Sequence, residues 1–302
     1  MPACQARLPD GRLHFQHGPI DIVIGADGNA HALEVAHAAA WRRFEVILDE
    51  LVAELPLLRQ RVDGPCVLNG PIARRMWMAC HPYREGYVTP MAAVAGAVAQ
   101  ELIAYYEVEG IERAWVNDGG DIAWHLAPQR SLRVGLFADL ARLDASQILH
   151  GIRTDGHLDV THAMPVRGVA TSGWRGRSFS RGIADSVTVL ARTAAEADAA
   201  ATVIANAVDV IDPRIVRKPA CEVKDDSDLG EIAVTVDVPA LGDDVTRRAL
   251  EAGARCAAAL REAGLIWSCT LVCQGQVTYV GETQLEPTVD ENPATVHATA
   301  LA

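Results

Sequence analysis

A carboxylate and a hydroxyl lie four residues apart in segment 197–202, which reads Ala-Asp-Ala-Ala-Ala-Thr. On a helix, Asp198 and Thr202 share one face just after the helix start. Oxygen ligands of this kind suit magnesium, a hard cation that keeps several waters for a phosphate to displace. A structural explanation competes with this one, because Asp198 also suits the positive end of its own helix and Thr202 can bond back to a carbonyl. The spacing alone favours the structural explanation.

A glycine-rich turn is the second candidate site, with the sequence Asn117-Asp118-Gly119-Gly120-Asp121. Paired glycines after a strand permit positive φ angles and allow a ligand to approach the backbone closely. An ordinary tight turn explains the same residues, because Asp-Gly is a common hairpin pair. The turn alone is therefore a weak indication of a binding site.

Hydroxyl groups followed by arginines form the third candidate. Segment 168–173 reads Gly-Val-Ala-Thr-Ser-Gly, and Arg175, Arg177 and Arg181 follow it. Arginine binds phosphate oxygens in a bidentate manner, so this segment could receive a pyrophosphate. A solvated basic loop explains the composition equally well.

Other motifs with a possible chemistry are weaker or missing. His157, Asp159 and His162 could ligate a metal, but in a strand His162 would not share the face of the other two. We therefore expect these three residues at polar surface positions. The chain contains no G-x-S-x-G, Walker or G-x-G-x-x-G motif, which disfavours hydrolase, P-loop and Rossmann proteins.

The composition limits the classes of partner and the location. The 302-residue chain has a formal net charge of −12, which argues against nucleic acid or an anionic membrane as partner. Its seven cysteines include no C-x-x-C pair, so buried or free thiols are expected. Met1-Pro2-Ala3 provides no apolar signal region, and no apolar run reaches the roughly 20 residues of a membrane span. We expect a cytoplasmic protein, in which Lys218 and Lys224 are the only lysines.

Helices and strands must position these residues, and the pattern of apolar residues predicts where they lie. The predicted helices cover 32–55, 91–106, 194–208 and 245–263. The predicted strands cover 20–24, 113–117, 121–126, 134–138, 168–171, 185–190 and 232–238, with a hairpin across 274–276. These elements intermingle without a regular βαβ order, which indicates an α+β fold with mixed or antiparallel sheets and packed helices. We expect one domain over 1–285 and a polar tail over 286–302.

In chain order, five segments resemble the ApbE family, the FAD:protein FMN transferases. That family carries a glycine- and alanine-rich helix, then N-x-G-G-D, A-T-S-G, a strand of S-V-T-V type and a helix reading T-A-x-x-A-D-A-x-A-T. The matching segments are 91–99, 117–121, 170–173, 186–189 and 193–202. The whole chain more closely resembles a cytoplasmic branch of this superfamily, through segments 18–21, 89–96, 172–178 and 226–230.

The resemblance implies an ApbE-like, T-fold-like fold that binds FAD. It places Mg²⁺ on Asp198, on the Thr202 hydroxyl and on a backbone carbonyl near Ala95. In the transferases, the metal lies at the pyrophosphate, which is cut so that FMN passes to a threonine of an acceptor protein. The residues implied to line the flavin nucleotide come from the two central motifs and the segment after them: Asn117, Gly119, Gly120, Ala170, Thr171, Ser172, Gly173 and Arg175.

Two departures separate the chain from the transferases. They place a lysine in the small-residue helix, whereas this chain has none before Lys218, and they carry a histidine after A-T-S-G, whereas none occurs here between His162 and His297. One hypothesis is an enzyme of magnesium-assisted flavin chemistry, either FMN transfer or FAD cleavage, with Asp185 or Asp121 as base. The alternative is a non-enzymatic flavin carrier or assembly factor. A third hypothesis, a redox protein, has no support, because the cysteines lack the spacing of an iron–sulfur site. A homodimer is the assembly that we consider.

Overall fold

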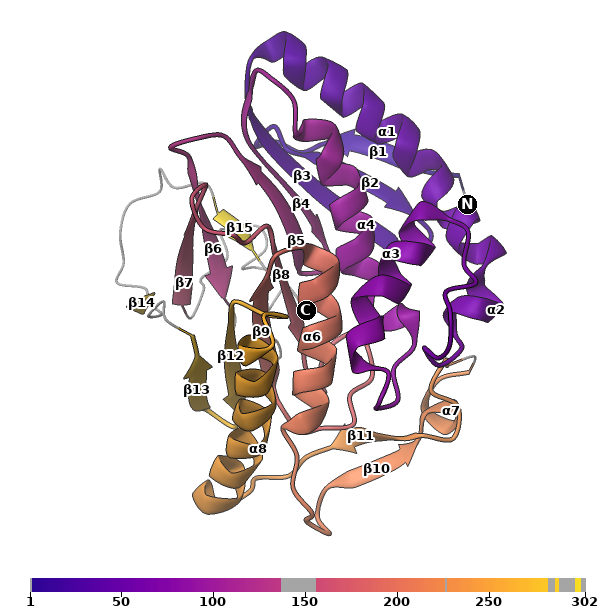
Figure 1. The fold of residues 1–302 in the computed structure, drawn as a ribbon, viewed down its shortest axis with the longest axis vertical. Coiled ribbons are helices and arrows are strands. Elements are labelled where there is room, and N and C mark those ends of the chain that lie inside the picture. Colours follow the sequence, from indigo (N-terminus) through magenta and orange to yellow (C-terminus); the bar gives the residue numbers. More distant parts are fainter. Residues whose placement is uncertain (1, 137–155, 226, 282–285, 288–296, 300–302) are drawn as a thin grey trace.

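An antiparallel nine-stranded sheet forms the centre of the protein, in the order β1-β2-β3-β4-β5-β8-β9-β12-β13 (Figure 1). The computed structural model describes residues 2–136, 156–225, 227–281, 286–287 and 297–299. The strands of this sheet are β1 Cys4–Arg7, β2 Leu13–His17, β3 Ile20–Gly28, β4 Ile111–Asp118, β5 Asp121–Leu126, β8 Gly168–Ser172, β9 Ser186–Ala191, β12 Ser268–Cys273 and β13 Gln276–Val280. Short turns join β1 to β2, β2 to β3, β4 to β5 and β12 to β13, and a longer loop joins β8 to β9. Helices lie in the chain between β3 and β4, two strands of a second sheet lie between β5 and β8, and helices with a two-stranded ribbon lie between β9 and β12.

Helices cover one face of this sheet, each over its own pair of strands: α1 on β2 and β3, α4 on β4 and β5, α6 on β8 and β9, and α8 on β12 and β13 (Figure 1). The α-helices are α1 Ala30–Ala53, α2 Leu55–Leu58, α3 Pro71–Cys80, α4 Val94–Ile103, α6 Ala194–Ala207, α7 Ala220–Val223 and α8 Asp243–Glu262. The short 3₁₀ helices are η1 His81–Tyr83, η2 Pro90–Ala93 and η3 Ala104–Tyr106. None of the helices in the described part of the chain is long and apolar enough to cross a membrane.

The opposite face of the central sheet packs on a second, smaller sheet. That sheet has the order β14-β7-β6-β15, with β6 Ser131–Leu136, β7 Gly156–Thr161, β14 Glu286–Pro287 and β15 His297–Thr299. Trp115 and Trp124 of the central sheet are buried there against apolar side chains of β6 and β7. Alternate residues of β5 therefore point to two separate cores. A two-stranded ribbon, β10 Val216–Pro219 with β11 Ala233–Asp237, completes the described structure.

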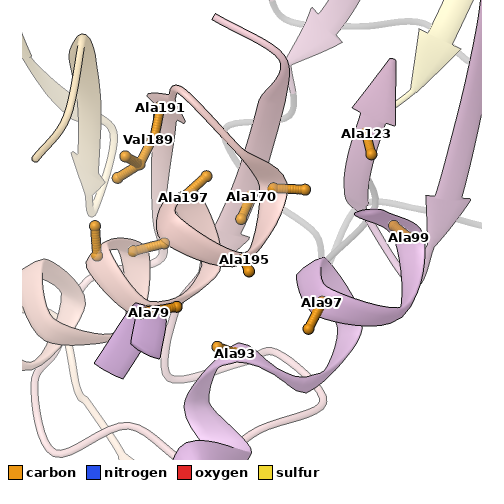
Figure 2. Close-up of a cluster of buried hydrophobic side chains, with 14 of the residues drawn as sticks. Ala79, Ala93, Ala97, Ala99, Ala123, Ala170, Val189, Ala191, Ala195 and Ala197 are labelled. Atoms are coloured by element: carbon orange, nitrogen blue, oxygen red, sulfur yellow. The ribbon is translucent and has the colours of Figure 1, made fainter. Parts of the chain in front are cut away.

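Small side chains allow the helices to lie close to the sheet and to one another. Buried alanines from α3, α4, α6 and the strands beneath them fill this layer (Figure 2). A Cβ added to Gly96 of α4 would lie 2.3 Å from the carbonyl oxygen of Ala194, at the start of α6. A Cβ added to Gly168 of β8 would lie 2.2 Å from the Ala194 nitrogen. The starts of α4, α6 and β8 consequently meet at Ala194, where larger side chains would not fit.

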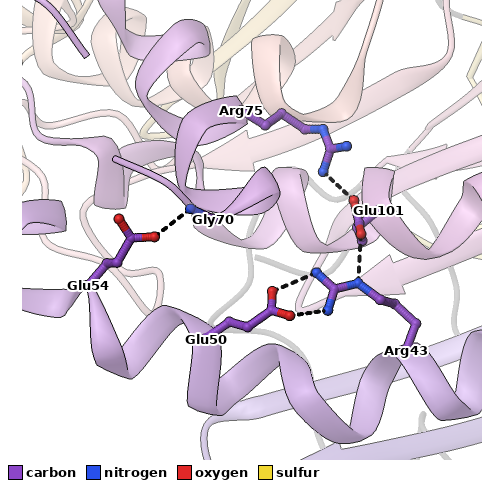
Figure 3. Close-up of polar contacts among 6 residues, drawn as sticks. All are labelled: Arg43, Glu50, Glu54, Gly70, Arg75 and Glu101. Carbon is purple, nitrogen blue, oxygen red and sulfur yellow. Dashed lines mark hydrogen bonds and ion pairs between the residues drawn. The ribbon is translucent and has the colours of Figure 1, made fainter. Parts of the chain in front are cut away.

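An ion-pair network fixes α4 against the helices outside it (Figure 3). The Arg43 guanidinium of α1 binds Glu50 at 2.7 Å and, through Nε, the Glu101 carboxylate of α4 at 2.7 Å. Arg75 of α3 donates to the other Glu101 oxygen at 2.8 Å. The side chains of Arg43 and Glu101 are only 11% and 14% exposed, so these pairs are screened less than surface pairs. The network holds three helices in one arrangement.

The α+β prediction is confirmed, as are the predicted strands at 20–24, 113–117 and 185–190 and the hairpin across 274–276. Segment 91–106 differs: it divides into η2, α4 and η3, because the backbone of Ala93 leaves the helical region with φ −135° and ψ 20°. Pro56 begins the short helix α2 rather than only ending α1.

Two predictions extend beyond the residues that the structure describes. The strand predicted at 134–138 ends at Leu136, and residues 137–138 lie outside the described part. In the predicted tail, Glu286–Pro287 pairs with β7 and His297–Thr299 pairs in parallel with β6. The other tail residues lie outside the described part, and the domain boundary at 285 stays a prediction.

Candidate functional site

A cleft opens at the start of α4, where the β4–β5 turn, the end of β8 and the first turns of α6 meet. It consists of two adjoining hollows, with volumes of ≈ 390 Å³ and ≈ 370 Å³, within the usual range of ligand pockets. The hollows share many lining residues, which are Met91, Val94, Ala95, Asp121, Arg177, Ser178, Asp198, Thr202 and Lys224. Because of this sharing, we treat them as one cleft.

The cleft brings together most of the residues that the sequence singled out. Three motifs far apart in the chain supply them: the glycine-rich turn, the A-T-S-G segment and the start of α6. The predicted residues that line the cleft are Ala95, Gly119, Asp121, Thr171, Ser172, Gly173, Asp198 and Thr202. The other predicted residues do not line it: Asn117, Gly120, Ala170, Arg175 and Asp185.

Three of the residues that do not line the cleft shape the elements that carry its lining: Asn117, Gly120 and Ala170. The Asn117 side-chain oxygen accepts a hydrogen bond from the Gly120 amide at 2.8 Å, which closes the turn. Gly119 and Gly120 have φ angles of 63° and 116°, in the region that favours glycine. Ala170 is fully buried in the core beneath the helices. These residues shape the turn and the strand end that hold the lining residues.

The placement of Arg175 and Asp185 gives no support to their predicted roles. Arg175 is exposed and stacks on the Trp174 ring at 4.8 Å from its centroid, whereas Arg177 lines both hollows. Asp185 accepts hydrogen bonds from the Trp174 indole at 3.3 Å and from the Gln274 amide. Asp185 thus connects a loop to the β12–β13 hairpin, and the cleft offers Asp121 as the other predicted base.

Asp198 caps a helix, but not the helix that contains it. The N-cap of α6 is Thr193, whose hydroxyl accepts from the Glu196 amide at 3.2 Å. The Asp198 carboxylate instead accepts a hydrogen bond from the Gly96 amide at 3.0 Å, at the start of α4. Such contacts satisfy the unpaired amides of a helix start. Asp198 thus has a structural contact at a helix start, as the structural explanation expects, but the helix is α4 and not α6.

Three carboxylates gather on the floor of the cleft. Asp118 and Asp121 are buried, and Asp121 lies within electrostatic reach of Asp198. Burial raises the pKa of Asp118 to about 8. Burial and the Asp198 charge raise the pKa of Asp121 well above its ordinary value, and burial raises that of Asp198. The cleft is therefore a place where a proton or a cation is favoured over three free carboxylates.

The carboxylates do not form a complete metal cage. Within the described residues, no three His, Cys, Asp or Glu side chains are placed to hold one ion. The predicted set has one carboxylate, one hydroxyl and one backbone group, so most ligands of a magnesium ion would come from water and phosphate, as is usual for this ion. Away from the cleft, Asp159 pairs with Arg133, and His162 is exposed and bonds to the Leu126 carbonyl. The histidine run agrees with the expected surface positions.

The sequence assigned no role to two charged residues of the cleft, Asp118 and Lys224. Asp118 is the variable position of the N-x-G-G-D motif, and the motif alone gives no sign that its side chain is buried beside Arg177. Lys224 lies in an acidic loop more than a hundred residues from the turn, yet it lines both hollows. The one available signal was composition, because Lys224 is one of only two lysines in the chain.

We predict that Asp118 makes the folded protein less stable as the pH rises. Its pKa is about 8 in the folded state against an ordinary 3.8, so the folded state holds the proton more tightly. That contribution is complete below about pH 4 and is lost as the pH rises through about 8. The free energy of unfolding is measured by urea denaturation without divalent cations. Between about pH 5 and pH 9 it should fall on the order of 3 kcal/mol further in the parent than in Asp118→Asn. Equal losses in the two proteins would contradict this assignment.

Relatives of the chain are found by sequence and by structure. The family model AbpE bacteria matches residues 5–279. A UPF0280 protein of Methanopyrus kandleri is 35% identical over 220 residues, which cover 72% of this chain and 83% of that protein. A UPF0280 protein of Methanospirillum hungatei is 30% identical, covering 67% of this chain and 77% of that protein. Among solved structures, the apo flavinyl transferase ApbE of Pseudomonas stutzeri aligns over 95% of this chain and 93% of its own, with a TM-score of 0.43 and 12% identity.

Proposed function

The chain belongs to the AbpE bacteria family, and from this premise we propose that it binds FAD and magnesium in the cleft and supports flavin chemistry there. The proposal covers transfer of FMN to an acceptor protein or cleavage of FAD. One observation carries it: the cleft joins the glycine-rich turn, the A-T-S-G segment and the start of α6 around one space. Each of these motifs alone has an ordinary structural explanation. Those separate explanations do not account for all three motifs lining the same cleft.

The charges of the cleft support a divalent cation together with a diphosphate. Asp118, Asp121 and Asp198 would repel the negative phosphates of FAD if they were all ionised. Among the described residues that line the cleft, four are cationic and five are carboxylates: Arg59, Arg177, Arg181 and Lys224 against Asp118, Asp121, Asp198, Asp225 and Asp228. The cations therefore cannot also balance the charge of a diphosphate. Magnesium between carboxylate and phosphate would remove this repulsion. The residues present thus fit the cofactor pair better than they fit FAD alone.

Each group has a definite task in this proposal. The metal would be held by Asp198, by Thr202 and by the backbone carbonyl near Ala95. It would neutralise phosphate charge and assist an in-line displacement. Gly119 leaves room for the Arg177 guanidinium in the cleft, because a Cβ there would lie 2.9 Å from its Nη1. Asp121 is the candidate base, since it lines the cleft and burial, together with the Asp198 charge, raises its pKa well above its ordinary value.

A flavin carrier without catalysis is the second candidate. No histidine lines either hollow in the described part of the chain. Asp198 also has a structural task, as the cap of α4, that would preserve it without catalysis. A carrier would bind FAD as tightly as an enzyme, but it would neither transfer FMN nor cleave FAD.

The variant Asp198→Asn tests the metal site. Asparagine keeps an oxygen that can cap α4 but loses the charge that attracts magnesium, so we expect the variant to fold and to lose most of the magnesium dependence of FAD binding. Losing one charged ligand should weaken binding in the presence of magnesium about 10- to 100-fold, measured by calorimetry. Asp159→Asn on β7 is the matched control and should bind like the parent. If Asp198→Asn also binds like the parent, Asp198 is a helix cap and no metal ligand.

A further inference from the structure

Lys224 stands at the rim of the cleft on a segment remote from the family motifs. It is the residue that follows α7, its side chain is exposed, and it lines both hollows. Among the described residues, no hydrogen bond or ion pair engages its ammonium group. Lys218, the other lysine, is exposed on β10 and lines neither hollow. The chain therefore places one of its two lysines where a ligand would contact it.

The segment that carries Lys224 is bonded to the residues before α4 at Asp228. The Thr89 hydroxyl, which is buried, donates to the Asp228 carboxylate at 2.5 Å, and the Tyr87 hydroxyl donates to the Asp228 carbonyl at 3.0 Å. Within the segment, the Cys221 amide donates to the Gly230 carbonyl at 2.9 Å, which closes the loop across its base. The backbone position of Lys224 is thus set while its side chain can turn toward a ligand.

Arg177 shares the same space but is partly occupied by protein groups. Its Nη2 donates to the Pro19 carbonyl at 3.3 Å, and its positive charge attracts the buried Asp118 carboxylate. A diphosphate suits more than one cation, since its two negative charges are spread over the non-bridging oxygens of two phosphate groups. A lysine is a compact charge with three donors on a flexible stem, which suits phosphate oxygens that arginine does not reach.

We propose that Lys224, together with Arg177, binds the phosphate oxygens of the nucleotide. This inference rests on the proposed function, and it assigns to the loop after α7 the phosphate-binding charge that the small-residue helix lacks. It also gives the β10–β11 ribbon and α7 a task, because they carry Lys224 to the cleft. Binding should then depend on the charge at position 224 for ligands with phosphates and not for riboflavin.

The test compares Lys224→Met, Lys224→Arg and the matched control Lys218→Met with the parent. Binding of FAD, riboflavin and inorganic pyrophosphate is measured by calorimetry with magnesium, and melting curves check that each variant is folded. We expect Lys224→Met to bind FAD and pyrophosphate about 10- to 100-fold more weakly, the value of one charged hydrogen bond, with riboflavin unchanged. Lys224→Arg should keep most of the affinity, and Lys218→Met should match the parent.

The outcomes separate this inference from the proposed function. If the parent binds FAD and Lys224→Met binds it within twofold of the parent, the inference is wrong and the proposed function stands. A proportional loss of riboflavin binding would also overturn it, because the loop would then act through structure. If the parent binds pyrophosphate through Lys224 but no flavin, the anion site stands and the flavin function fails. A parent that binds none of these ligands overturns both.

Discussion

Incubated with FAD, magnesium and a threonine-bearing acceptor protein, this chain should leave the acceptor almost unlabelled. The transferases that it resembles use a histidine after A-T-S-G, whereas this chain has no histidine between His162 and His297. The described lining of the cleft contains none either. Loss of a general acid–base group typically costs two to four orders of magnitude in rate, about 3–5 kcal/mol of barrier. We therefore expect a transfer rate lower by at least about 100-fold than that of an ordinary ApbE transferase.

The measurement is in-gel flavin fluorescence of the acceptor, with an ApbE transferase as the positive control under the same conditions. The absence of labelling together with tight FAD binding would favour the carrier or a different flavin reaction. Labelling at the rate of the control would contradict the prediction. In that case Asp121→Asn would show whether the buried carboxylate has replaced the histidine as base.

Replacing Gly96 by alanine should destabilise the protein by about 2–4 kcal/mol, among the largest effects of adding a single methyl group. The added Cβ would lie 2.3 Å from the Ala194 carbonyl oxygen and 2.9 Å from the Asp198 Cβ. Both neighbours belong to α6, and the Ala194 atom is backbone, so α4 and α6 must separate. This separation would also break the hydrogen bond from the Gly96 amide to Asp198. The variant should lose magnesium-dependent FAD affinity as well as stability.

Urea denaturation measures the loss of stability in Gly96→Ala, and Gly86→Ala is the matched control. Gly86 is exposed, and a Cβ there would meet only the Tyr83 carbonyl oxygen, at an ordinary 3.6 Å. That control should stay within about 0.5 kcal/mol of the parent. If Gly96→Ala were as stable as Gly86→Ala, the close packing of α4 on α6 would not be needed for the fold.

The local pattern of the sequence predicted several elements of the fold, whereas β1, β2, β7, β10 and the helix α3 were not predicted. Alternating β-branched residues located β3 and β9, and the alanine-rich run located α6, because these signals depend on near neighbours. The break of 91–106 into three helical pieces was not predictable in this way. One contact at the start of α4 is remote in sequence, because the Gly96 amide donates to the Asp198 carboxylate about a hundred residues later.

The same limit explains which site residues were found. Gly119, Thr171 and Asp198 belong to motifs, so their spacing located them. The loop after A-T-S-G has no periodicity, and nothing in it distinguished Arg175, which stacks outward on Trp174, from Arg177, which faces the cleft. Lys224 reaches the cleft only through tertiary hydrogen bonds at Asp228, which no local pattern reveals.

The central claim is that the cleft binds FAD with the help of magnesium, and calorimetric titration of the parent with FAD tests it most directly. The titration is run with magnesium and with a chelator, and FMN, ATP and NAD serve as comparison ligands. We predict a dissociation constant for FAD below about 100 μM, that is, binding stronger than about −5.5 kcal/mol. We further predict tighter binding with magnesium than without it, and weaker binding of the comparison ligands. No flavin affinity at this level, with or without magnesium, would contradict the account.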